Sequence, residues 1–240
     1  MNIQITGISD CHGMWPEDFF MNYEHANGDI LICCGDITNR GSVGEAIDWA
    51  VQWNEVAKNY KRTFLIPGNH DECFDTDSEK FENLVDQMKA AMPNLEVFLG
   101  GSTHHQGIKF GFNPYVLRYG SYDFMTNEEG IFAKLQRLGR CDVFVSHGPS
   151  FGLLDQTTRM VQAGSNTQRA YVDTHQPCAH LFGHIHESAG VMEYGKTFLM
   201  NAGIRNYPSP GLWEEHTFIV DSVTKDVSYG SDIALSCKTN

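Results

Sequence analysis

The sequence predicts an α/β protein in which stacked sheets are covered on the outside by helices. Short apolar segments rich in β-branched and aromatic residues alternate with segments of helical periodicity, and each apolar segment ends in polar residues. After residue 187 the pattern changes to strands and turns. With 240 residues, 41% of them hydrophobic, the chain can bury a sizeable core. Because no linker, repeat or charge block interrupts residues 1–240, we expect a single domain.

The apolar segments are expected to be strands, because their length and their β-branched and aromatic content favour buried strands over helices. The expected strands, each with the polar cluster that follows it, are residues 3–12, 29–36, 62–71, 142–149 and 178–186. Four more are expected after residue 187, in the segments GVMEY, KTFLM, EHTFIVD and KDVSYG. Ligands of α/β sheets bind where strands end and loops begin, so the polar clusters mark the candidate functional edge.

The expected helices lie between these strands and are Val43–Tyr60, Ser78–Met92, Asn127–Leu138 and Asn166–His175. In the first helix, Ser42 is the expected N-cap, and Ile47, Val51 and Val56 are expected near one apolar face. The second helix is expected to stop at Pro93.

The charge balance restricts the classes of partner. Lys+Arg total 17 and Asp+Glu total 30, so the net charge of −13 disfavours long polyphosphate chains such as duplex nucleic acid. The opening MNIQITGISD has neither a basic segment nor a long apolar run, so we expect a cytoplasmic protein without a membrane partner. The 7 cysteines, with Cys33 and Cys34 adjacent in an apolar run, are expected to be reduced and mostly buried.

Two pairs of residues have the spacing of metal ligands. Asp10-x-His12 and His184-x-His186 each place side chains at i and i+2, which point to the same side of an extended chain. A D-x-H pattern should occur about 0.7 times by chance in such a sequence, but G-N-H, H-G-P and G-H-x-H each only about 0.03–0.07 times. Finding all of them, each behind an apolar strand, is therefore strong support for a functional site.

Further polar residues stand next to glycines, which let the backbone turn sharply and approach an ion or a phosphate. They are Asp36 after Gly35, Asn69 and His70 after Gly68, and His147 before Gly148. Together with the two pairs they offer carboxylate, amide and imidazole ligands but no thiolate. Such a set suits Mn²⁺, Fe or Zn²⁺ better than a structural cysteine-zinc site. Because ligating histidines must be neutral, we expect metal affinity to fall below about pH 6.

The ordered motifs DCH, GD, GNHD, SHG and GHIH resemble the calcineurin-like metallophosphoesterase superfamily over residues 3–186. More narrowly, FGHIHESAG, SHGPSFGLLDQ, GNHDECFD and GFNPY resemble the small metallophosphoesterase-domain-containing proteins related to class III cyclic-nucleotide phosphodiesterases. The resemblance implies a four-layer αββα sandwich, with two stacked mixed β-sheets flanked by helices and a site for two divalent metal ions at its loop edge.

Matched residue by residue, the resemblance implies two sets of metal ligands. The first ion would take Asp10, His12, Asp36 and His186. The second would take Asp36, Asn69, His147 and His184, so that Asp36 bridges both ions. Mn²⁺ is the first expectation for the metal, with Fe, Zn²⁺, Ni²⁺ and Mg²⁺ as alternatives.

The resemblance also implies catalytic roles. His70 would stand just outside the metals as the general acid, and Asp71 would orient His70 or support the loop. Arg40 lies in GDITNRG, which resembles the GDxxDRG of phosphoprotein phosphatases, although Asn39 replaces the usual Asp. It would grip phosphate oxygens with its guanidinium, and the alternative is an exposed loop cation. Arg118 is a further candidate for lining the substrate site.

The expected function is hydrolysis of a small phosphodiester, a cyclic nucleotide or another nucleotide-derived diester. Two ions about 3.5–4 Å apart attract a small phosphate anion and turn a shared water into the attacking hydroxide. The alternatives are a phosphomonoesterase or protein phosphatase, a nuclease for short single strands, and a metal-binding interaction module without turnover. Selectivity is expected to come from residues 102–126 and 150–176, and the sequence assigns no oligomeric state.

The remaining residues of chemical interest have simpler interpretations. Histidines outside the motifs are expected to be hydrogen-bonded or on the surface, namely His25, His104, His105, His175, His180 and His216. Cys11 is expected to be buried and inert, and Cys237 to be a solvated tail thiol. Trp49 and Trp53 are expected in the core or an interface, because base-stacking aromatics would have basic neighbours.

Overall fold

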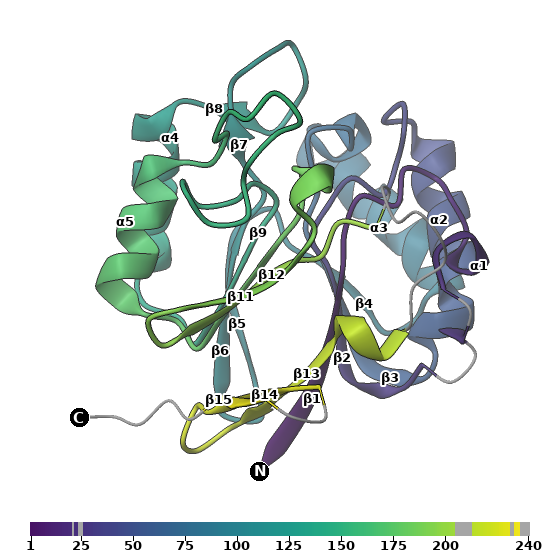
Figure 1. The fold of residues 1–240 in the computed structure, drawn as a ribbon. Helices are drawn as coiled ribbons and strands as arrows, with labels where there is room; N and C mark the ends of the chain where they lie inside the picture. The colour runs from purple at the N-terminus through teal and green to yellow at the C-terminus, as the bar shows by residue number, and fades with distance from the viewer. Residues whose placement is uncertain (21, 24–25, 205–212, 231–232, 236–240) are drawn as a thin grey trace.

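Two β-sheets stack face to face in the structure, a computed structural model that describes residues 1–20, 22–23, 26–204, 213–230 and 233–235 (Figure 1). The 7-stranded sheet has the order β15-β14-β13-β1-β2-β3-β4. Its strands are β1 (Asn2–Ile8), β2 (Gly28–Cys33), β3 (Tyr60–Leu65), β4 (Leu95–Val97), β13 (Thr217–Asp221), β14 (Val227–Tyr229) and β15 (Ile233–Leu235). Since β13 pairs with β1, the strand-rich tail completes the sheet that the first strand begins.

The 6-stranded sheet has the order β11-β12-β10-β9-β6-β5. Its strands are β5 (Gly101–His105), β6 (Ile108–Asn113), β9 (Val143–Ser146), β10 (Ala179–Phe182), β11 (Gly190–Tyr194) and β12 (Thr197–Asn201). A separate 2-stranded sheet joins β7 (Val116–Leu117) to β8 (Met125–Thr126).

Helices cover both outer faces, as Figure 1 shows. Beside the larger sheet lie α1 (Pro16–Phe19), α2 (Val43–Ala57) and α3 (Ser78–Ala91), and beside the smaller one α4 (Glu128–Leu138) and α5 (Asn166–His175). Short 3₁₀ turns are η2 (Glu72–Phe74), η3 (His186–Ser188) and η4 (Trp213–His216). The predicted four-layer αββα sandwich is therefore confirmed. Within the described ranges, no helix combines the length and the apolar character needed to cross a membrane.

Alternation along the strands divides the core into layers. In β2, Leu31 and Cys33 pack toward the helices, while Ile30 and Ile32 pack between the two sheets. Because both faces of such a strand are buried, its sequence is continuously apolar. The stacking of the sheets brings the carboxyl ends of β1, β2 and β3 close to those of β9 and β10.

Helix α2 begins where the sequence predicts and ends earlier. Ser42 is its N-cap, and the hydroxyl accepts a hydrogen bond from the Glu45 amide at 3.2 Å. The predicted helix Val43–Tyr60 extends too far, because the helix ends at Ala57 and Tyr60 already begins β3.

The predicted buried face of α2 needs a correction at Val51, which is 56% exposed. The face is instead centred on Trp49 and Trp53, which are fully buried with stacked rings 6.3 Å apart, as core residues. At about 100° per residue, Val51 lies about 200° around the helix from Trp49 and therefore faces solvent.

The hairpin of β5 and β6 lies in a region where the sequence analysis expects no strand. Ile108, Phe110 and Phe112 alternate along β6 and pack between the sheets, a strand signal that is present in the sequence. The hairpin turns at Gln106 and Gly107, whose φ values of 48° and 83° suit a two-residue type I′ turn.

Candidate metal centre

The candidate ligands follow strands from both sheets. Asp10 follows β1, Asp36 follows β2 and Asn69 follows β3, while His147 and His184 follow β9 and β10. Parallel pairing of β1 with β2, β2 with β3 and β9 with β10 puts these strand ends at one edge. The structure thus brings together the residues that the motifs single out, including side chains that lie far apart in the chain.

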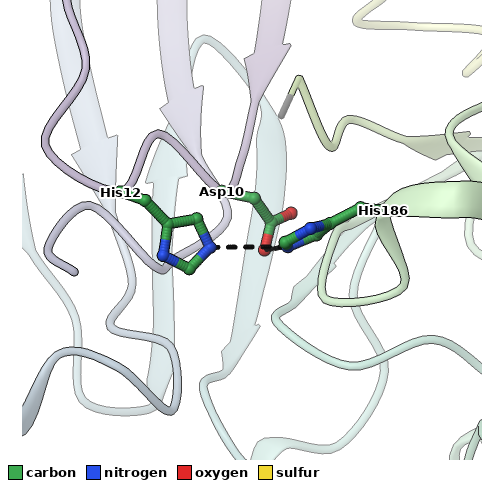
Figure 2. A group of neighbouring side chains, drawn as sticks. All are labelled: Asp10, His12 and His186. Atoms are coloured by element: carbon green, nitrogen blue, oxygen red, sulfur yellow. Dashed lines mark hydrogen bonds and ion pairs between the residues drawn. The ribbon is translucent and has the colours of Figure 1, made fainter. Parts of the chain in front are cut away.

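Asp10, His12 and His186 form the first candidate ligand group, and Figure 2 shows their side chains pointing toward one another. The Nε2 atom of His186 lies 3.1 Å from Oδ1 of Asp10 and 3.4 Å from Nε2 of His12. The His184 amide donates a hydrogen bond to Oδ2 of Asp10 at 3.0 Å, which orients the carboxylate. The ligand atoms of this group lie within 4.8 Å of one another, as a shared cation requires.

Asp36, His147 and His184 form the second group, and Asn69 adjoins it. Nε2 of His147 lies 3.3 Å from Oδ2 of Asp36 and 3.2 Å from Oδ1 of Asn69. Nδ1 of His147 lies 2.7 Å from the carbonyl oxygen of Cys34 and must donate its hydrogen there, since a carbonyl only accepts. The remaining lone pair on Nε2 therefore faces two acceptor oxygens, an arrangement that needs either a proton or a cation between them.

Asp36 connects the two groups. Its Oδ2 atom lies 3.8 Å from Nε2 of His12, in the first group, as well as 3.3 Å from His147 in the second. Its Oδ1 atom accepts the His70 amide at 2.8 Å. With His12 and His70, Asp36 also forms a third set of atoms close enough to hold an ion. The position of this carboxylate fits the bridging role that the sequence resemblance implies.

The pKa values of the buried groups indicate that the side chains alone leave negative charge at the site unbalanced. Burial opposes charge on His147, but the Asp36 carboxylate outweighs it and raises the pKa of His147 to about 9. Burial likewise opposes the charge on Asp36, and His147 lowers the pKa of that carboxyl well below its usual range. Without a cation the site therefore keeps a proton on His147. The donor set of carboxylate, amide and imidazole fits divalent metal ions in its place.

The backbone of the site is held in an uncommon conformation. Left-handed φ values between 46° and 69° occur at Asp10, His12, Asp36 and His184. Non-glycine residues adopt this region rarely, and such strain collects at functional sites. Gly35 packs against the site so closely that a Cβ atom there would lie 2.7 Å from Nδ1 of His147.

His70 is half-buried beside these groups. Its Nδ1 atom lies 3.1 Å from the carbonyl oxygen of Asn39 and donates its hydrogen there. Its ring packs edge-on against that of His12, with centroids 4.8 Å apart. The tautomer leaves Nε2 of His70 as the nitrogen that can take up and release a proton.

Asp71 braces two loops of the site. Its fully buried carboxylate accepts hydrogen bonds from the amides of Ile37, Thr38 and Gly68 and from the Thr38 hydroxyl, at 2.8–3.3 Å. Burial, with the nearby Asp36, raises the pKa of Asp71 to about 6. These contacts assign Asp71 to support of the loops that carry Asp36 and Asn69.

The sequence profile of the calcineurin-like phosphoesterases matches residues 3–188, which contain every candidate ligand. This chain belongs to that family. Family members typically use divalent metal ions, in agreement with the donor groups described above, and the membership indicates a metal-dependent hydrolase.

Proteins of two animal species match most of this chain. A UPF0046 protein of Caenorhabditis elegans is 29% identical over 210 residues, which cover 83% of this chain and 69% of that protein. Metallophosphoesterase domain-containing protein 1 of Homo sapiens is 26% identical over 224 residues, 82% of this chain and 64% of that protein.

Solved structures share the fold at low sequence identity. TT1561 of Thermus thermophilus has a TM-score of 0.61 at 13% identity, covering 96% of this chain and 99% of that one. GAP50 of Plasmodium has a TM-score of 0.54 at 12% identity, covering 99% and 90%.

The two candidate arginines lie at the surface of this phosphoesterase. The Arg40 side chain is exposed, and its amide donates to the Glu45 carboxylate at 3.2 Å. Arg118 is also exposed, and Nη2 donates to the carbonyl oxygen of Met125 at 3.2 Å. A grip on phosphate by Arg40, and a place for Arg118 in the lining of the substrate site, stay predictions.

Two tyrosines beside the ligands were missed by the sequence analysis. The Tyr119 hydroxyl accepts a hydrogen bond from Nδ2 of Asn69 at 3.1 Å, and its ring lies 5.5 Å from that of His184. The ring of Tyr122 lies 4.9 Å from that of His70. No spacing in the sequence marks these residues, since they lie in a loop without periodicity.

Several of the residues given simpler interpretations are buried histidines and buried thiols. His180 hydrogen-bonds to the Ser146 hydroxyl at 2.9 Å and His216 to the carbonyl oxygen of Gly7 at 3.0 Å. Cys11, like Cys33, is a fully buried free thiol. His25 and Cys237 lie outside the described residues.

Proposed function

We propose that this protein is a metal-dependent phosphodiesterase that hydrolyses a small diester, a cyclic nucleotide or another nucleotide-derived diester. The observation that carries the proposal is the convergence of two ligand groups on the shared carboxylate of Asp36. The net charge of −13 supports a small substrate over a long polyanion, because the favourable charge is confined to the metal centre.

Divalent cations bound by these residues would supply positive charge and Lewis acidity toward a phosphoryl group. The chain's own residues position the metal ligands and the candidate acid. Asp71 fixes the loops that present Asp36 and Asn69. His70, with its Nδ1 hydrogen held by Asn39, is placed to give a proton from Nε2 to the leaving oxygen.

Support for the diester comes from the resemblance to cyclic-nucleotide phosphodiesterases, and the test compares diesters with monoesters directly. Rates are measured on bis(p-nitrophenyl) phosphate and on p-nitrophenyl phosphate, with Mn²⁺, Fe²⁺, Zn²⁺, Ni²⁺ or Mg²⁺ added to chelator-treated protein. We expect faster turnover of the diester, and its loss on chelation. A strong preference for the monoester would instead support a phosphomonoesterase or protein phosphatase.

The competing interpretation is that the protein is not an enzyme but a metal-binding interaction module without turnover. None of the residues matched to the family's ligands is missing from this chain, which favours an enzyme. Protein that binds two ions per chain yet cleaves neither ester nor a panel of cyclic nucleotides would overturn the proposal.

A further inference from the structure

Tyr119 and Tyr122, here called the tyrosine pair, line the metal centre with aromatic rings. Their ring centroids lie 5.9 Å apart. The ring centroid of Tyr119 lies 5.5 Å from that of the candidate ligand His184. The ring centroid of Tyr122 lies 4.9 Å from that of His70. The pair therefore lies beside both a candidate ligand and the candidate proton donor.

The tyrosine pair is exposed although the loop that carries it is anchored. Tyr119 is 61% exposed and Tyr122 47%. The loop follows β6, whose carboxyl end lies next to that of β9, and it is closed by a hydrogen bond from the Val116 amide to the Phe124 carbonyl at 2.9 Å. Phe124 is only 4% exposed and packs into the core under the helices of the larger sheet. The loop thus presents two rings to solvent at a fixed place.

We propose that the tyrosine pair binds a planar aromatic substituent of the phosphoester, a nucleobase or an aryl group, by stacking on the exposed rings. The inference rests on the proposed function, because it assigns a substrate class to the same site. A phosphoryl group held at the centre carries its ester substituents outward by one oxygen, and the rings of the pair lie next to two histidines of that centre. Exposed tyrosine faces stack on flat aromatic groups. Divalent cations bound at the adjacent centre would supply the positive charge that basic neighbours supply in other nucleotide sites.

The experiment measures binding with ligands that cannot be hydrolysed. Phenylphosphonate and cyclohexylphosphonate have the same charge and similar size, but only the first is planar. We expect the Mn²⁺-loaded protein to bind phenylphosphonate ~10-fold more tightly in calorimetry, the scale of one stacking contact. In Tyr122→Leu the two affinities should become equal, at unchanged metal content.

Two further variants serve as controls. Tyr119→Phe keeps the ring and should keep the preference for the phenyl group. Phe132→Leu removes another exposed aromatic side chain, on α4, and should also leave the preference unchanged. An unchanged preference in Tyr122→Leu, or no preference in the unaltered protein, would overturn the inference.

Because binding of a phosphonate requires no bond cleavage, the inference and the proposed function can fail separately. A preference that depends on Tyr122, in a protein that hydrolyses no ester, supports the inference and contradicts the proposed function. Rapid diester hydrolysis without any preference for the planar ligand overturns the inference alone.

Discussion

Two histidines in neighbouring parts of the smaller sheet are fully buried and yet titrate in opposite directions. His147 follows β9 at the metal centre, where burial opposes its charge but Asp36 raises its pKa to about 9. His180 lies within β10, where burial alone lowers its pKa to about 3. Its ring lies 4.6 Å from those of Phe144 and Phe182.

The difference shows that buried polar groups become a binding site only where charge is left uncompensated. Nε2 of His180 donates to the Ser146 hydroxyl at 2.9 Å, and that hydroxyl donates to the Gly148 carbonyl at 2.6 Å. Its Nδ1 has no hydrogen-bond partner among the described residues, so a second proton would be buried without an acceptor. The surroundings of His180 need only a neutral ring. The metal centre around His147 needs a proton or a cation to balance the Asp36 carboxylate.

Removing the charge of Asp36 should abolish the difference between His147 and His180, and it should have the largest effect on metal binding of the changes considered. In Asp36→Asn the shared carboxylate is lost, so occupancy of both ions should fall, with affinity lower by at least ~100-fold. The pKa of His147 should drop as well, because Asp36 is the main group that raises it, and only the smaller effects of Asp10 and the Cys34 carbonyl would then oppose burial. Metal content by elemental analysis and an NMR titration of His147 test both effects. The exposed Asp86→Asn is the matched control, and equal metal loss in both variants would contradict the assignment.

His70→Asn should separate proton transfer from metal binding. The variant removes the candidate acid but leaves the ligands in place, so turnover should fall ~10²–10⁴-fold, the usual contribution of a positioned acid. Metal content should stay at the level of the unaltered protein. The surface variant His104→Asn provides the comparison. Metal loss as severe as in Asp36→Asn would show that His70 is a ligand instead.

The raised pKa of His147 predicts a wide pH dependence of metal binding. Below about pH 9 the metal-free protein carries a proton on His147, and a cation must displace it. Apparent affinity should thus fall by up to ~10-fold for each pH unit below about 9, not only below about 6 as an unperturbed histidine would give. Adding Mn²⁺ in weak buffer should release about one more proton per chain at pH 7 than at pH 10, because a proton lost from metal-bound water is released at both pH values. Equal release at both pH values would contradict the prediction.

The elements and the donor types could be predicted from sequence, because both depend on short-range patterns. The pairs Asp10-x-His12 and His184-x-His186 could be found from their spacing, and the cap at Ser42 from its hydroxyl. The extended chain expected for the pairs was wrong, because Asp10, His12 and His184 lie beyond the strands with left-handed backbones, and His184 and His186 join different ligand groups. These signals need only a few neighbouring residues, and they suffice to identify the layers and the edge.

The positions of Tyr119 and Val51 could not be predicted, because they depend on contacts across the fold. Tyr119 reaches Asn69 only because Phe124 anchors its loop in the core beneath the opposite sheet's helices. Val51 has the apolar character of a core residue, but Trp49 and its neighbours determine which side of α2 is buried. The left-handed backbone at Asp36 likewise results from loops meeting across two sheets.

The smallest effect should come from His180, and it concerns acid stability alone. Above about pH 6.5 His180 is neutral in both states, so it adds no pH dependence. As the pH falls from about 6.5 toward 3, His180 becomes protonated in the unfolded chain but stays neutral in the folded chain. The unfolding free energy should therefore decrease by ~1.4 kcal/mol per pH unit. In His180→Phe, which fills the space between Phe144 and Phe182, this contribution should vanish, while that of His216, whose pKa burial lowers to about 4, remains. Urea unfolding at pH 7 and pH 5 measures the slope, and identical slopes in the variant and the unaltered protein would show that His180 already accepts a proton in its aromatic surroundings.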